Sequence, residues 1–245
     1  MLALAVVLGA ALSVSAYEVA SVPDGGALTG VVKLAGVPPR LEPLKVTRAP
    51  EACGDERPSE ALVLGTSRTV QGSVVLLEGV TRGKKERGDV VLDTQRCAFV
   101  SHVSAAMFGD RVRVKNSDTT VHNPHGFLGK SRVFSVAVPG KDQMIDITKR
   151  LTRPGVVRVL CGVHPHMQGW IVLHDSPYFA VTDEGGAFRI DGIPPGTYKV
   201  TMWHEGFRAK GVDRDGRPAY GEPKTVTKEV TIGARAQAAI DFELR

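Results

Sequence analysis

The sequence lacks any apolar run long enough to cross a bilayer. Its longest one, residues 1–16 (MLALAVVLGAALSVSA), is shorter than the roughly 20 residues of a spanning helix. It has the length of a signal-peptide core, and the small residues Val14 and Ala16 suit cleavage before Tyr17. No Lys or Arg precedes the core, which leaves open a misassigned start or a retained anchor. We expect a signal peptide, a periplasmic or secreted protein, and no membrane span after cleavage.

A sustained 3.6-residue apolar period is also missing, which argues against a helical protein. Short runs rich in β-branched residues occur instead, bounded by Gly, Pro or Asp. Several alternate apolar with polar residues, as half-buried strands do. The sequence therefore predicts an all-β chain with strands at residues 28–34, 72–77, 89–92, 111–115, 133–138, 156–161 and 169–173.

Aromatic residues make up only 6% of the chain, and no nucleic-acid motif accompanies its net charge of +5. We therefore expect no nucleic-acid partner. Basic residues are scattered except for one cluster, formed by Arg82, Lys84, Lys85 and Arg87. This cluster is read as a solvated loop, with a docking patch for an acidic partner as the alternative.

The sequence changes character near residues 174–180. A hairpin turn is predicted at Asp183–Gly186 and a second turn at Pro194–Gly196. Residues 175–245 thus read as a small β-sandwich. The pattern T-D-x-x-G-x-F followed by P-P-G-x-Y, from Thr182 to Tyr198, resembles the carboxypeptidase regulatory-like (transthyretin-like) domain. Residues 17–74 are an N-terminal arm, whose segment 25–39 could be the first strand of that sandwich.

Two separated segments carry a set of soft metal donors. Cys161, His164 and Met167 form C-x-x-H-x-x-M in a loop between two predicted strands, and His122 follows the strand at residues 111–115. One thiolate, two imidazoles and a thioether are the donors of a copper site that changes between Cu(I) and Cu(II). We expect one copper ion per chain at these four residues.

Residues 75–174 resemble a cupredoxin, the plastocyanin/amicyanin-like blue copper family. The resemblance rests on G-D-x-V-x-x-x-N-x-D from Gly109 to Asp118, on the dipeptide His122-Asn123, and on the short ligand loop. It implies a Greek-key β-sandwich and a mononuclear type 1 (blue) copper site that transfers single electrons between redox partners. It also implies that Asn123 ties the ligand loops together and that electrons pass through an exposed edge of His164.

The remaining histidines depart from that pattern or lie outside it. His166 stands between Pro165 and Met167, where many related chains carry an aromatic residue, and is expected to be exposed. His125 and His166 are alternative ligands. We expect His102 and His174 to lie at the surface or to form hydrogen bonds. His204 is expected to have a structural role, and Trp170 is expected to pack behind the ligand loop.

If Cys161 binds copper, Cys53 and Cys97 remain. A Cys53–Cys97 disulfide is the economical expectation for an exported chain, although connectivity does not follow from sequence alone. It would join the N-terminal arm to the first sandwich.

Three functions are compatible with these residues. The first is the electron carrier, the second a copper storage or delivery protein, and the third a metal-free structural or binding module. An enzyme is disfavoured, because a dinuclear copper centre needs a second cysteine in the ligand loop. A trinuclear centre needs more than the 7 histidines present.

Overall fold

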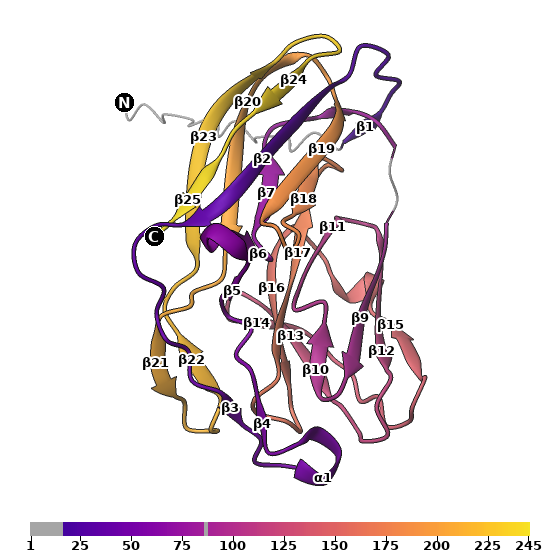
Figure 1. Cartoon of the computed structure of the whole chain (residues 1–245). Helices are drawn as coiled ribbons and strands as arrows, with labels where there is room; N and C mark the ends of the chain where they lie inside the picture. The colour runs from indigo at the N-terminus through magenta and orange to yellow at the C-terminus, as the bar shows by residue number, and fades with distance from the viewer. Residues whose placement is uncertain (1–16, 86–87) are drawn as a thin grey trace, which may run out of the picture.

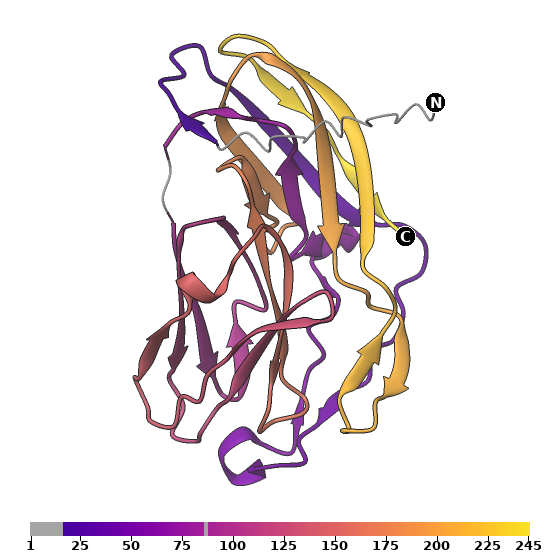
Figure 2. The ribbon, with the colours of Figure 1, turned by 180° about the vertical axis from the view of Figure 1, so that it is seen from behind.

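The computed structural model describes residues 17–85 and 88–245. The expected signal peptide and Arg87 of the basic cluster lie outside these ranges. Within them the chain is all-β and forms two β-sandwiches, one above the other in Figure 1 and seen from behind in Figure 2. This confirms the predicted fold class. No helix in the described ranges has the length and apolar character of a membrane span.

The first sandwich pairs a four-stranded with a five-stranded sheet. The smaller sheet runs in the order β10 (Ala98–Val100), β9 (Asp89–Gln95), β12 (Arg111–Asn116) and β15 (Met144–Asp146). The larger runs β11 (Val103–Met107), β17 (Gln168–His174), β16 (Gly155–Cys161), β13 (Pro124–Leu128) and β14 (Ser131–Ser135).

The second sandwich draws strands from both ends of the chain. One sheet is β18 (Phe179–Val181), β7 (Val74–Leu77), β20 (Gly196–His204) and β23 (Lys224–Ile232). The other has β2 (Gly26–Leu34) between β19 (Ala187–Ile193) on one side and β24 (Gln237–Ala239) and β25 (Phe242–Leu244) on the other. Segment 25–39 thus supplies a strand of this sandwich.

Strand β7 falls on the other side of the boundary that the sequence predicts. Its residues Val74–Leu77 pair with β18 and β20, so the strand belongs to the second sandwich. The run VVLL is apolar on both faces and is almost wholly buried. Such a run predicts a strand but carries no information on which sheet receives it.

Short elements complete the fold. They are the strand pairs β1 (Glu18–Val19) with β8 (Arg82–Gly83), β3 (Leu44–Lys45) with β4 (Glu56–Arg57), β5 (Val63–Leu64) with β6 (Val70–Gln71), and β21 (Ala209–Val212) with β22 (Pro218–Tyr220), the helix α1 (Pro50–Cys53), and 3₁₀ turns at Thr66–Arg68 and Thr148–Arg150. Residues 44–57, here called the arm loop, lie with α1 at the end of the first sandwich remote from β2 (Figure 1).

The two sandwiches pack directly on each other. Val74 and Trp203 of the second contact Val103 and Val172 of the first in one apolar cluster. The rings of Trp170 and Trp203 meet edge to face, with centroids 5.3 Å apart. Trp170 therefore packs at this interface, not behind the ligand loop as the sequence suggested.

A substitution at Gly30 on β2 tests how closely the second sandwich is packed. A Cβ at this position would lie 1.8 Å from the carbonyl oxygen of Ile240, which is backbone and cannot rotate away. We expect Gly30→Ala to lower the free energy of unfolding by about 1–3 kcal/mol in urea denaturation, because the strands must separate. The control Gly185→Ala lies on an exposed turn and should change stability by less than about 0.5 kcal/mol. Equal stability of the two variants would contradict this packing.

Candidate metal centre

Strand alternation places Cys161 inside the first sandwich. Along β16 every second residue is buried, so that Val157, Val159 and Cys161 share the inward face. Cys161 is the last residue of the strand and is fully buried. Its thiol is therefore held at the end of the core, where the loops between sheets meet.

Asn116 organises the loop that presents His122. It occupies the third inward position of β12, after Val112 and Val114. Its side-chain amide donates to the carbonyl oxygens of Thr120 and Val138, at 2.9 and 2.8 Å. The backbone of His122 exchanges hydrogen bonds with Val138 at 3.3 and 2.8 Å. The loop between β12 and β13 is thus held together by the buried side chain of Asn116. His122, near the end of this loop, has a fixed backbone position.

The loop from Cys161 to Met167 closes on itself. The backbone amide of Met167 donates to the carbonyl of His164 at 3.1 Å, and that of Cys161 donates to the carbonyl of Met167 at 3.3 Å. His164 is fully buried, and Met167 is 2% exposed. This short loop therefore brings its three candidate donors back to one end of the core.

Three donor atoms converge in the interior. Cys161 Sγ lies 3.9 Å from His122 Nδ1 and 3.7 Å from His164 Nδ1, and the two Nδ1 atoms are 3.2 Å apart. Ligand atoms that share one ion at bond lengths of about 2.0–2.3 Å are separated by roughly 3–4 Å. The side chains present fit a metal ion held by a thiolate and two imidazoles.

The protonation states also suit a metal. Burial lowers the pKa of His122 below 6.5, against the opposing effect of Asp118. Burial, together with the neighbouring His122 and His166, lowers the pKa of His164 to about 4. Both imidazoles are neutral at pH 7, which is the form that binds metal. The Asp118 carboxylate accepts from Nε2 of His122 at 3.0 Å, so the Nδ1 lone pair faces the thiol.

Asn123 ties the two ligand segments together through its backbone. Its amide points at Cys161 Sγ, 3.5 Å away, and its carbonyl accepts from the amide of Gly162 at 2.8 Å. The resemblance attributed this role to Asn123 without naming the atoms.

The Cys53–Cys97 disulfide is formed, leaving Cys161 as the free cysteine. It lies beside the candidate centre, with a ring nitrogen of His164 within 4.8 Å of both of its sulfurs. Residues Val46 and Cys53 of the arm loop pack into the same core cluster as Cys161 and Met167. The arm loop is therefore part of the wall of the site.

Two expectations about exposure are wrong. His164 has no exposed surface, so its imidazole edge does not reach solvent as the resemblance implied. His166 is 5% exposed, and its Nε2 donates to the carbonyl of Cys97 at 3.1 Å. Both differences have one cause, which is that the arm loop and its disulfide lie over this end of the sandwich. Among the described residues, the candidate metal clusters contain neither His125 nor His166.

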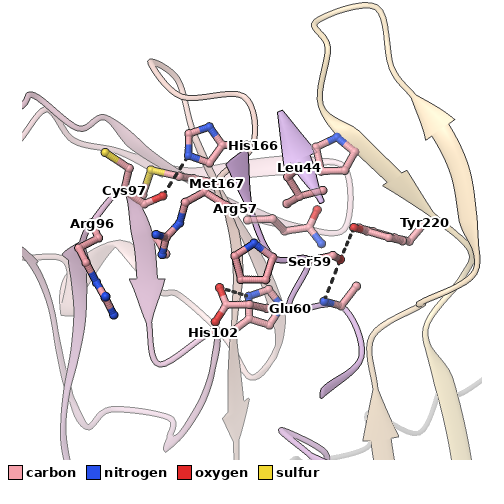
Figure 3. Close-up of a pocket in the computed structure, with 15 residues that line it drawn as sticks. Leu44, Arg57, Ser59, Glu60, Arg96, Cys97, His102, His166, Met167 and Tyr220 are labelled. Atoms are coloured by element: carbon pink, nitrogen blue, oxygen red, sulfur yellow. Dashed lines mark hydrogen bonds and ion pairs between the residues drawn. The ribbon is translucent and has the colours of Figure 1, made fainter. Parts of the chain in front are cut away.

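A pocket of about 240 Å³ lies beside the ligand loop (Figure 3). Arg57 and Glu60 line it from the N-terminal arm, His166 and Met167 from the ligand loop, and Tyr220 from β22. The ligand loop is thus flanked on this side by both the N-terminal arm and the β21–β22 pair.

A buried polar network joins the sandwiches, and no motif in the sequence predicts it. The Glu205 carboxylate, 2% exposed, pairs with His102 Nε2 and accepts from Gln168 Nε2 at 2.9 Å. His204 Nδ1 donates to the Glu205 carbonyl at 2.7 Å, which agrees with the structural role expected for His204. Outside this network, His174 Nε2 donates to the Leu77 carbonyl at 3.0 Å, as expected for a hydrogen-bonded residue.

Solved structures similar to this chain include copper proteins. Amicyanin from Paracoccus versutus is 18% identical, with a TM-score of 0.32, and the match covers 54% of this chain and 99% of amicyanin. The purple cupredoxin of Nitrosopumilus maritimus is 13% identical, with a TM-score of 0.30, over 35% of this chain and 98% of that one.

The copper-containing nitrite reductase of Thermus scotoductus SA-01 is 22% identical, with a TM-score of 0.32. The match covers 40% of this chain but only 25% of the reductase. At these identities and TM-scores, the assignment of the site rests on its own geometry.

One family profile matches residues 155–238, that of domain II of polysaccharide lyase family 4. The match includes β16 and β17 of the first sandwich and β18, β19, β20 and β23 of the second, and it is not to the carboxypeptidase regulatory-like domain that the sequence pattern resembled. It spans less than half of the chain. No curated protein matches this sequence.

Proposed function

We propose that this chain is an exported protein that binds one copper ion through His122, Cys161, His164 and Met167 and transfers single electrons between redox partners. The observation that carries the proposal is the convergence of Cys161 Sγ and two histidine Nδ1 atoms, 3.2–3.9 Å apart, in a fully buried position. The disulfide between Cys53 and Cys97 supports export, because such bonds persist in oxidising compartments.

The donor set supports copper over other metals. Structural zinc sites use four Cys, His or carboxylate ligands, whereas two His, one Cys and a weak Met ligand are typical of blue copper. Copper at such a site cycles between Cu(II) and Cu(I) with the gain or loss of one electron. The chain would contribute a buried enclosure whose two imidazoles have lowered pKa values and are therefore neutral before the metal binds.

The enclosure supports an electron carrier over an enzyme. A catalytic metal keeps an open position for substrate, whereas the proposed centre has four protein donors and three of them are fully buried. Because His164 is covered, electrons would enter through the wall of the site and not through an exposed imidazole. Gly162 and Pro165 of the ligand loop line a surface hollow together with Arg48. We propose that a redox partner docks at this hollow and exchanges electrons with the copper ion there.

Voltammetry of the copper-loaded protein tests this function. We expect a reversible one-electron wave and measurable electron exchange between oxidised and reduced protein. Copper transfer to an acceptor protein without any reversible wave would instead favour storage or delivery. A preparation that fails to bind copper at one equivalent would favour the metal-free module.

A further inference from the structure

Building on the proposed copper site, we propose that Asp118 is a positioning residue for His122, and that the Cys53–Cys97 disulfide holds the turn that keeps Asp118 in place. The two cysteines would thus form part of the metal centre without binding the metal. The inference rests on a continuous set of hydrogen bonds from the turn to the histidine ring.

The Asp118 carboxylate is held by three donors. Its Oδ1 accepts from the backbone amide of Arg96 at 2.6 Å, and its Oδ2 accepts from that of Cys97 at 2.8 Å. The same Oδ2 accepts from Nε2 of His122 at 3.0 Å. The Asp118 amide donates in turn to Asn116 at 2.9 Å. The carboxylate therefore has a defined position, and one orientation of the His122 ring satisfies it.

The orientation of the His122 ring determines which of its two nitrogens faces the Cys161 thiol. A buried imidazole with no acceptor for Nε2–H would leave that polar group unpaired, which is unfavourable in the protein interior. With Asp118 in place, Nε2 carries the proton and Nδ1 is directed at Cys161 and His164. Partners that orient a metal-binding histidine typically contribute about 10–100-fold to metal affinity.

The turn that supplies the two amides has an unfavourable backbone conformation. Arg96 and Cys97 both have positive φ values, 49° and 54°, in the connection between β9 and β10. Residues other than glycine rarely adopt left-handed backbone, because their Cβ atom crowds the following carbonyl oxygen. The disulfide from Cys53 fixes Cys97 in this conformation, and the Cys97 carbonyl accepts from His166 of the ligand loop at 3.1 Å. One turn thus contacts both ligand segments.

Asp118→Asn is the primary test, since the amide keeps the shape of the side chain but places an NH₂ group where an acceptor is needed. We expect Cu(I) affinity, measured by competition with a chromophoric chelator, to fall about 10–100-fold. Asp146→Asn is the matched control, because Asp146 also caps a backbone amide, that of Thr148, and pairs with Arg111. Its Cu(I) affinity should stay within about threefold of the parent protein, within the scatter of distant substitutions.

Nitrogen-15 NMR of the metal-free proteins gives a readout that does not depend on copper. We expect His122 to be the Nε2–H tautomer in the parent protein and a mixture of tautomers in Asp118→Asn. If the parent protein binds no Cu(I), the proposed function fails, while this tautomer comparison still tests the positioning. Copper binding with equal affinity and equal His122 tautomer in both proteins overturns the positioning alone.

The role of the disulfide is tested by its coupling to Asp118. We expect Cys53→Ala/Cys97→Ala to lower Cu(I) affinity in the same direction as Asp118→Asn. Adding Asp118→Asn to the disulfide-free protein should then cost less than about threefold more, since both changes break the same set of contacts. Multiplicative losses would show that the disulfide acts independently of Asp118 and would overturn this part of the proposal.

Discussion

Replacing Cys161 with serine is expected to weaken copper binding by more than about 100-fold, exceeding the loss typical for a residue that only orients a ligand. The thiolate is the one anionic donor in the cluster of His122, Cys161 and His164. A serine hydroxyl stays protonated at neutral pH and is a poor donor for Cu(I), which prefers soft ligands. Cu(I) competition with a chelator measures the loss.

His125→Gln is the control for this prediction. The His125 ring lies beside Gly162 of the ligand loop, within about 3 Å of where a Cβ on that glycine would be. It is not part of the described donor clusters. Its loss should change Cu(I) affinity by less than about threefold, within the scatter of independent sites. If His125→Gln weakened binding as much as Cys161→Ser, the assignment of ligands would be wrong.

Glu205→Gln is expected to lower the free energy of unfolding by about 3 kcal/mol or more at pH 7. The reason is that Glu205 is buried between the sandwiches and pairs with His102, so its loss leaves the buried imidazole with the more exposed Glu60 carboxylate, 3.8 Å from Nδ1, as its remaining charged partner. Urea denaturation measures the change. The control Glu243→Gln removes an exposed pair with Arg245 and should cost less than about 1 kcal/mol. A change below about 0.5 kcal/mol for Glu205→Gln would contradict the network, since that is typical of a surface substitution.

The same pair predicts a pH dependence. Burial alone would lower the pKa of His102, but the Glu205 carboxylate, with Glu60 adding to it, raises that pKa above 6.5. A raised folded-state pKa contributes stability that is fully present below 6.5 and is lost as pH rises through the folded value. The stability difference between the parent protein and Glu205→Gln should therefore be larger at pH 6 than at pH 9. A difference that grows with pH would contradict a charged His102.

The sequence predicted the parts of the site that are local. Cys161, His164 and Met167 lie within one short loop, and strand alternation alone directs Cys161 inward. The hydrogen bond between Asp118 and His122 could also have been predicted, since Asp118 stands four residues before His122 in the N-x-D motif. A carboxylate at that separation can reach the ring of the candidate ligand histidine.

The missed features all depend on contacts between distant segments. The burial of His166 results from the arm loop, whose Cys53 joins Cys97 across 44 residues. The pairing of His102 with Glu205 spans 103 residues and crosses between the sandwiches. A hydrophobic pattern specifies which face of a strand is buried but not which segment covers it. For the same reason, β7 could be predicted as a strand without its sheet.

The visible absorption spectrum of the protein during Cu(II) titration tests the central claim most directly. We expect an intense blue thiolate-to-copper band that saturates at one equivalent per chain, because one buried thiol faces two neutral imidazoles. Weak absorption, or copper uptake with no such band, would show that residues 122, 161 and 164 do not form a blue copper centre.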